Sequence, residues 1–195
     1  QHPESVARWH DVPAWSLEHF ALMEPIMKRL AEAGQKTITT TLVHEAWGGQ
    51  TYDAFPSMIE WRKHKNGSWS FDYSAFDAWV TFMTDRVGMK NARIHCYTMV
   101  PWSLKFRYFA EEKSAFAEAS LRPGTPEYDA HWGRFLEDFT KHLKAKGWLK
   151  RTLIGMDERP DALMRGAMET LKKHAPEIGI ASAINAPSEL TREFA

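Results

Sequence analysis

The sequence has very little cysteine: Cys96 is the single thiol among 195 residues. One thiol excludes a disulfide within the chain, and inside a strand-like run it is most simply a small buried hydrophobe. A charge surplus is also missing, since 25 Lys and Arg balance 25 Asp and Glu. Without a basic surplus the chain has no electrostatic basis for holding a phosphate backbone, so we expect no nucleic-acid partner.

Long hydrophobic runs are absent as well, so we expect no membrane insertion. No signal peptide is visible, and because the first residue is Gln1 rather than methionine, we expect a trimmed N-terminus. The sequence has no P-loop, no GxGxxG loop and no GxSxG elbow. What it does have is ordinary globular composition, 44% hydrophobic and 26% charged, with an unusual nine tryptophans.

Helix and strand patterns alternate along the chain. Helices are predicted after caps at Ser16, Ser74 and Thr125 and over Asp161–His174. Short β-branched or apolar runs predict four strands, at Thr37–Val43, Ala92–Met99, Arg151–Met156 and Ile178–Ile184. The connections after the strands are long and those after the helices are short. With no domain boundary visible, we expect residues 1–195 to form one unit.

This alternation predicts an α/β fold with a parallel sheet. The sheet could be doubly wound, or it could be part of a (β/α)8 TIM-type barrel, which needs about 250 residues. The asymmetric connections and the missing strand before the first helix favour the barrel, of which this chain would cover roughly the first half, from the end of strand 1 to about strand 5. Its strands should then lie parallel in chain order, and its open edge should pair with another chain or with the rest of a longer one.

Two adjacent carboxylates, Asp157 and Glu158, follow the strand Arg151–Met156. Both candidate folds place chemistry at the carboxyl ends of their strands. Neighbouring desolvated carboxylates raise each other's pKa, so a fold brings them together for a use or keeps both in water. The alternative is that acids placed just before a helix satisfy its N-terminal amides. The pattern leaves both interpretations open.

Nine histidines raise the question of a metal site. A metal-dependent hydrolase using His44, Glu45 and His95 is one alternative function. However, the stretch HEAWG does not match the HExxH signature, and no Cys or His spacing fits zinc. We therefore predict hydrogen-bonded pocket or core histidines, and neither a metal nor another cofactor.

The aromatic residues divide into two groups. Trp79, Trp132 and Trp148 fall on helix faces or a helix end, which predicts core packing. The second group falls in the connections after strands and consists of Trp47, Tyr52, Trp61, Trp69, Trp102 and Tyr108. Rings around a cleft at the strand ends suit stacking on the apolar faces of sugars. The alternative for each ring is that it anchors its loop.

Several stretches together resemble family 123 of the glycoside hydrolases: QHP (residues 1–3), AEAGQKTITTTLVHEAWGGQTYD (31–53), CYTMVPWSLKFRY (96–108), HLKAKGW (142–148) and MDERP (156–160). The resemblance implies a bacterial β-N-acetylgalactosaminidase acting on glycans with terminal β-linked N-acetylgalactosamine. It also implies a (β/α)8 catalytic barrel, usually preceded by a β-sandwich domain, and a secreted, periplasmic or cell-surface protein.

The resemblance also implies roles for the two carboxylates. Glu158 would protonate the leaving oxygen and then activate water, while Asp157 would hold the N–H of the sugar's 2-acetamido group. The acetamido oxygen would attack the anomeric carbon, giving an oxazolinium intermediate and net retention. Six further residues are predicted to bind the substrate: His2, Glu45, Trp47, Tyr97, Trp102 and Asn185.

The adjacency of the pair bears on this mechanism. A glycosidase that supplies its own nucleophile needs two facing carboxyl groups about 5–5.5 Å apart. Adjacent strand residues point to opposite sides, so Asp157 and Glu158 are badly placed for that role but can grip two parts of one sugar. A carbohydrate-binding relative without turnover is the alternative from another class. The intact pair argues against it, because a binding module needs no acid.

Overall fold

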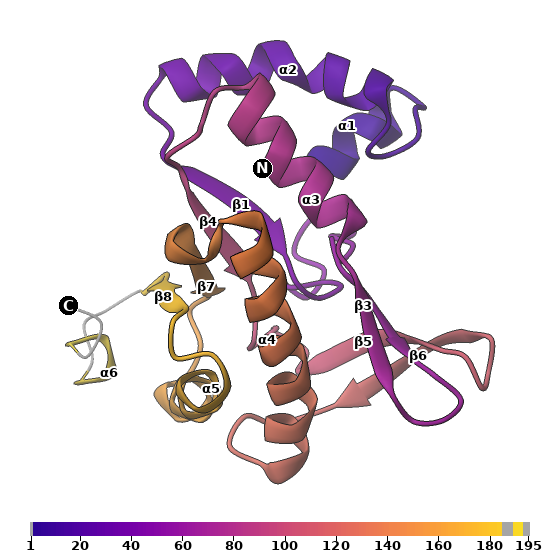
Figure 1. The fold of residues 1–195 in the computed structure, drawn as a ribbon, viewed down its shortest axis with the longest axis vertical. Coiled ribbons are helices and arrows are strands. Elements are labelled where there is room, and N and C mark those ends of the chain that lie inside the picture. Colours follow the sequence, from indigo (N-terminus) through magenta and orange to yellow (C-terminus); the bar gives the residue numbers. More distant parts are fainter. Residues whose placement is uncertain (1, 185–188, 193–195) are drawn as a thin grey trace.

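The computed structural model describes residues 2–184 and 189–192, which form two four-stranded sheets and their helices (Figure 1). The helices are α1 (Pro3–Trp9), α2 (Leu17–Glu32), α3 (Ser74–Thr81), α4 (Pro126–Lys146), α5 (Asp161–His174) and α6 (Glu189–Arg192), with a π-helical turn at Phe82–Arg86 and a 3-10 turn at Leu149–Arg151. Within these described ranges, no helix combines the length and apolar character that crossing a membrane requires.

The first sheet consists of β1 (Thr37–Thr41), β4 (Arg93–Tyr97), β7 (Thr152–Met156) and β8 (Gly179–Ser182). All neighbours are parallel and lie in chain order. This confirms the predicted parallel order and rules out a flavodoxin-like order, in which the second strand would lie outside the first. Because the strands run the same way, their carboxyl ends meet at one edge.

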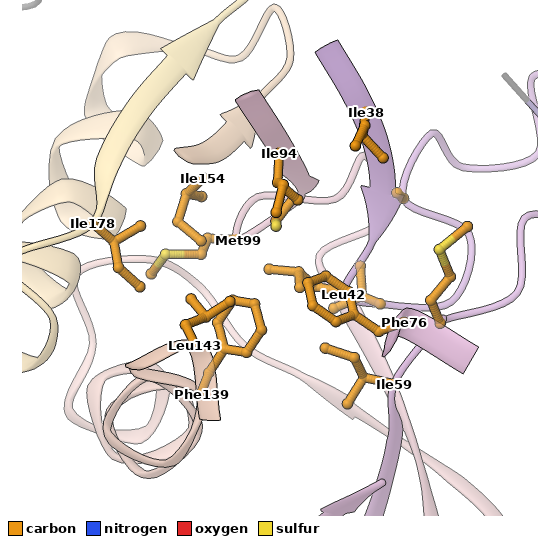
Figure 2. Close-up of a cluster of buried hydrophobic side chains, with 14 of the residues drawn as sticks. Ile38, Leu42, Ile59, Phe76, Ile94, Met99, Phe139, Leu143, Ile154 and Ile178 are labelled. Atoms are coloured by element: carbon orange, nitrogen blue, oxygen red, sulfur yellow. The ribbon is translucent and has the colours of Figure 1, made fainter. Parts of the chain in front are cut away.

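Helices cover one face of this sheet. Ile38, Ile94 and Ile154 are fully buried and point toward Phe76 of α3 and Phe139 of α4 (Figure 2). Along β4 the alternate residues, which point to the other face, are half-buried or exposed. The two faces of the sheet therefore differ, as expected when side chains alternate and helices pack on one side.

Two of the predicted helix caps are confirmed and one is wrong. Ser16 accepts a hydrogen bond from the amide of His19 at 3.1 Å, and Thr125 caps α4 by accepting from Tyr128 at 3.3 Å. Ser74 caps nothing and is the first residue of α3. Its amide donates to Asp72 at 2.8 Å, so the aspartate provides the turn that leads into this helix.

The second sheet corrects the sequence interpretation. It consists of β3 (Trp69–Asp72), β2 (Glu60–Lys63), β5 (Lys105–Ala110) and β6 (Ala115–Ser120), in that order. These strands lie in the long connections after β1 and β4, where the sequence predicts no strand. Each connection forms an antiparallel hairpin, and the two hairpins join through parallel pairing of β2 with β5. These short strands gain their partners only in the folded chain.

Two of the aromatic residues in the connections, for which the sequence left cleft lining and loop anchoring both open, pack in or against the core under this sheet. Trp61 is only 4% exposed, and its ring stacks on Phe135 and His131 of α4 at 4.4 and 4.9 Å between centroids. Burial lowers the pKa of His131 to about 3, so this imidazole is neutral. Trp69 is half-buried and packs edge-on against the same histidine. The predicted core positions Trp79 and Trp132 are fully buried.

Candidate active site

Asp157 and Glu158 lie directly after β7, at the edge where the parallel strands end. Asp157 is half-buried and Glu158 is exposed. The helix that follows, α5, has Pro160 in its cap position and no side-chain hydrogen bond from that cap. The Asp157 carboxylate instead accepts a hydrogen bond from Trp102, in a different part of the chain. This arrangement favours a use for Asp157 beyond helix capping.

Trp102 holds the Asp157 carboxylate. The indole Nε1 of Trp102, in the connection after β4, donates to Oδ2 of Asp157 at 2.6 Å. The Arg159 guanidinium lies over the Trp102 ring at 4.5 Å and donates to its backbone carbonyl at 3.3 Å. Gly48 completes the support, because a Cβ on it would lie 2.9 Å from Cβ of Trp102. One carboxylate oxygen is thus occupied in a fixed orientation.

Tyr97 forms the wall beside Asp157. Its ring covers Gly155 of β7, where a Cβ would lie 2.6 Å from Cε2 of the tyrosine. Trp47 packs against Tyr97 at 5.1 Å and against Phe55 at 4.6 Å between centroids. Burial, and then the negative charge of Asp157, raise the pKa of the Tyr97 phenol. The phenol therefore stays neutral and remains a possible hydrogen-bond donor.

The dependence of this wall on Gly155 can be tested. Gly155→Ala is expected to lower the free energy of unfolding by about 1–3 kcal/mol, because the added Cβ meets a ring that Trp47 backs. Gly179→Ala is the matched control: its Cβ would meet Cδ2 of Leu153 at 2.7 Å, the mobile end of a flexible side chain. Urea unfolding of both variants measures the difference. Equal stabilities would contradict tight packing of Tyr97 on β7.

Glu45 and His2 support the aromatic wall through Phe55. Glu45 Oε1 accepts from the Phe55 amide at 2.8 Å. The His2 ring lies 3.7 Å from the Phe55 ring between centroids and hydrogen-bonds the Ala54 carbonyl at 3.1 Å. Burial lowers the pKa of His2, which favours the neutral ring. In this structure both residues position the loop behind Trp47.

The structure therefore brings six of the predicted site residues to one edge, where Phe55 lies behind them: Glu45, Trp47, Tyr97, Trp102, Asp157 and Glu158. His2 joins them through Phe55, while Asn185 lies outside the described residues. Sequence reasoning missed Phe55, Gly48 and Arg159. Arg159 stands in the MDERP stretch, so its position was visible, but nothing in the pattern indicated that it packs on Trp102.

The residues considered for a metal do not converge. His44 and Glu45 lie at the carboxyl end of β1, whereas His95 lines a cavity of about 850 Å³ together with Lys36 and Arg93, at the opposite ends of the strands. His44 Nε2 has the Arg107 guanidinium 3.2 Å away. Among the residues that the structure describes, no cluster of three or more His, Cys, Asp or Glu side chains could hold a metal ion.

Comparisons with known proteins identify a family and a similar fold. Residues 1–193 match the family model described as "Glycoside hydrolase 123, catalytic domain". The structure is similar to that of a family 123 glycoside hydrolase from Clostridium perfringens, with a TM-score of 0.90 and 32% identity. The match covers 94% of this chain and 34% of that one, so this chain spans about a third of the relative's length. The relative was studied for glycolipid glycan hydrolysis. No curated protein matches the chain.

The family model thus covers almost the entire chain, and the similar structure has the same fold over nearly all of it. The carboxylate pair at the end of β7 lies within the matched region. On these grounds the chain belongs to family 123 of the glycoside hydrolases, a family of glycosidases.

Proposed function

We propose that this chain carries the catalytic carboxylates of a retaining exo-β-N-acetylgalactosaminidase. Its substrate would be a glycan with terminal β-linked N-acetylgalactosamine. The observation that carries the proposal is the Asp157 carboxylate, which Trp102 orients at 2.6 Å at the edge where the parallel strands end. Glu158 follows it directly and is exposed to solvent.

The proposed mechanism gives the two carboxylates different tasks. Glu158 donates a proton to the leaving oxygen, and the 2-acetamido oxygen attacks the anomeric carbon to form an oxazolinium. Asp157 accepts the acetamido N–H through the oxygen that Trp102 does not occupy, and its negative charge stabilises the cation that develops. Glu158 then takes a proton from the water that opens the oxazolinium, so the β configuration is retained.

The surroundings suit this division of work. A carboxylate that must orient one amide needs to be held still, and the contact with Trp102 provides that. Trp47, Tyr97 and Trp102 supply apolar surface for the faces of a sugar ring, and the neutral phenol of Tyr97 adds a donor beside Asp157. We propose all three as substrate-binding residues, with Glu45 and His2 positioning the loop that carries Trp47.

The proposal includes an incomplete barrel. Four parallel strands in chain order, covered by helices on one face, fit strands 2–5 of a (β/α)8 barrel. The same proposal includes the remaining strands of the barrel and a preceding β-sandwich domain. It also includes Asn185 as a residue that binds the sugar. So does a location in the periplasm, at the cell surface or outside the cell. The 195 residues by themselves are therefore proposed as part of a catalytic domain.

The stereochemistry of hydrolysis tests this function. The full-length protein is expected to hydrolyse an aryl N-acetyl-β-galactosaminide and to release the β anomer first, which proton NMR resolves before mutarotation. The corresponding N-acetylglucosaminide measures selectivity for the galacto configuration in the same assay. Release of the α anomer first, or no hydrolysis of either glycoside, would overturn the proposal.

A further inference from the structure

Arg107 does not form an ion pair with Glu118, the residue opposite it in the second sheet. In the antiparallel pair of β5 and β6, Arg107 is in register with Glu118. Opposed residues in such a pair lie close enough for an ion pair. Instead, Glu118 pairs with Lys105 at 3.5 Å, while the Arg107 guanidinium lies 3.2 Å from His44 Nε2 and 4.0 Å from the centre of the Phe116 ring.

Within the described part of the chain, Arg107 makes no ion pair. Burial, and then the positive charge of Arg107, lower the pKa of His44, so the imidazole is neutral and accepts from the guanidinium. The adjoining strand offers a contrast. Arg62 also lies over a ring, that of Phe109 at 4.6 Å, but it pairs with Glu60 at 2.5 Å.

Two cavities meet at His44 and Arg107. One has a volume of about 360 Å³ and a polar lining that includes Gly48, Ser103 and the ion pair of Lys105 with Glu118. The other has a volume of about 280 Å³, and its lining includes Tyr108, Phe116 and Glu60, whose carboxylate pairs with Arg62. The guanidinium therefore stands between a polar space and an aromatic one, and much of its donor capacity remains available because His44 uses only one N–H.

The polar cavity adjoins the candidate active site. Its lining residue Ser103 follows Trp102 in the chain, and its lining residue Gly48 packs directly against Trp102. Trp102 in turn holds Asp157. Glu45 also lines this cavity, but one of its oxygens accepts from the Phe55 amide. A glycan whose terminal sugar lies at Asp157 can thus extend past Trp102 toward Arg107.

We propose that Arg107, with Phe116, forms a subsite for the leaving-group part of the glycan that binds an anionic substituent, either a carboxylate or a sulfate. The inference rests on the proposed function of the Asp157 and Glu158 pair. The planar guanidinium fork matches a carboxylate or sulfate in a bidentate geometry. Phe116 is 55% exposed and offers a ring for the apolar face of the sugar that carries the anion.

Matched substrates test the subsite in the full-length protein. The substrates are three N-acetyl-β-galactosaminyl disaccharides, which differ only in the second sugar: galactose, galacturonate or galactose 6-sulfate. We expect the kcat/KM of at least one acidic substrate to exceed that of the neutral one by about 10- to 100-fold, the range for a hydrogen bond to a charged group. The carboxylate and sulfate arms identify which anion the pocket takes.

Three variants assign the preference to Arg107. In Arg107→Gln the ratio of acidic to neutral kcat/KM should fall to about one, and Arg107→Lys should restore part of it because the charge returns without the fork. Arg62→Gln removes the other arginine that stacks on a ring of this sheet and should keep the wild-type ratio. Using a ratio cancels any general loss of activity or folding. A ratio near one in the wild-type protein, or one that Arg107→Gln leaves unchanged, overturns the subsite.

A binding measurement separates this inference from the proposed function. Methyl β-galactoside, methyl β-galacturonide and methyl β-galactoside 6-sulfate are titrated by NMR into the wild-type protein and the Arg107→Gln variant. Should the aryl N-acetylgalactosaminide not be hydrolysed while an acidic glycoside still binds through Arg107, the proposed function fails and the anion site stands. Should hydrolysis occur while all three glycosides bind alike in both proteins, the subsite fails and the function stands.

Discussion

Glu158→Gln is expected to reduce turnover of natural glycosides by about 10²–10⁴-fold, the usual contribution of a general acid. The amide cannot protonate a poor leaving group such as a sugar hydroxyl. A nitrophenyl leaving group needs little protonation, so a much larger share of the first step should survive on nitrophenyl N-acetyl-β-galactosaminide. The measurement is the kcat/KM of both substrate types for variant and wild type.

Glu177→Gln serves as the control for this prediction. Glu177 is also an exposed glutamate, but it pairs with Lys144 at 2.5 Å and lies beyond the end of α5. Its neutralisation should change neither substrate's turnover. If Glu158→Gln lowers both substrates by the same factor, Glu158 is not the proton donor to the leaving group, and the division of roles between the two carboxylates is wrong.

The order of the first sheet could be predicted because each strand carries its own local pattern. Thr37–Thr41 is a β-branched run, and Thr152–Met156 is an apolar run that ends on charge. The predicted boundaries exceed the observed ones by one or two residues at most ends, as expected where strands fray into turns. Regular alternation with helices then restricts the topology to very few choices.

The second sheet could not be predicted in the same way. β2 has four residues, and its parallel partner β5 comes from a different connection, after β4. Such a strand has no local signal strong enough to separate it from a loop. The role of Trp61 could not be decided either, because a ring in a connection has the same appearance in the sequence whether it lines a cleft or packs on α4.

The position of the candidate site was predictable, but its contacts were not. A strand that ends on two acids places Asp157 at the functional edge of a parallel sheet whatever surrounds it. The hydrogen bond from Trp102 joins residues 55 positions apart, and the packing of Tyr97 on Gly155 depends on the register of β4 with β7. Neither of these contacts produces a periodic pattern in the sequence.

Asp157→Asn is expected to lose activity on activated and natural substrates alike. The amide keeps the shape of the side chain, and its oxygen can still accept from Trp102, but the negative charge that orients the acetamido group and stabilises the oxazolinium is gone. Removing one such electrostatic contact typically costs about 10²–10³-fold in kcat. The loss strikes the intramolecular attack itself, so a better leaving group should not relieve it.

Two further arms make this prediction decisive. Trp102→Phe leaves the Asp157 charge in place but removes the donor that holds it at 2.6 Å, so its loss should be smaller than that of Asp157→Asn and equally independent of the leaving group. An aryl β-galactoside, in which a hydroxyl replaces the acetamido group, should be inert with the unmodified protein because it lacks the internal nucleophile. Comparable turnover of the galactoside, or a covalent glycosyl adduct on Asp157 or Glu158, would show that a protein carboxylate is the nucleophile, and the adjacency of the pair would then need a different explanation.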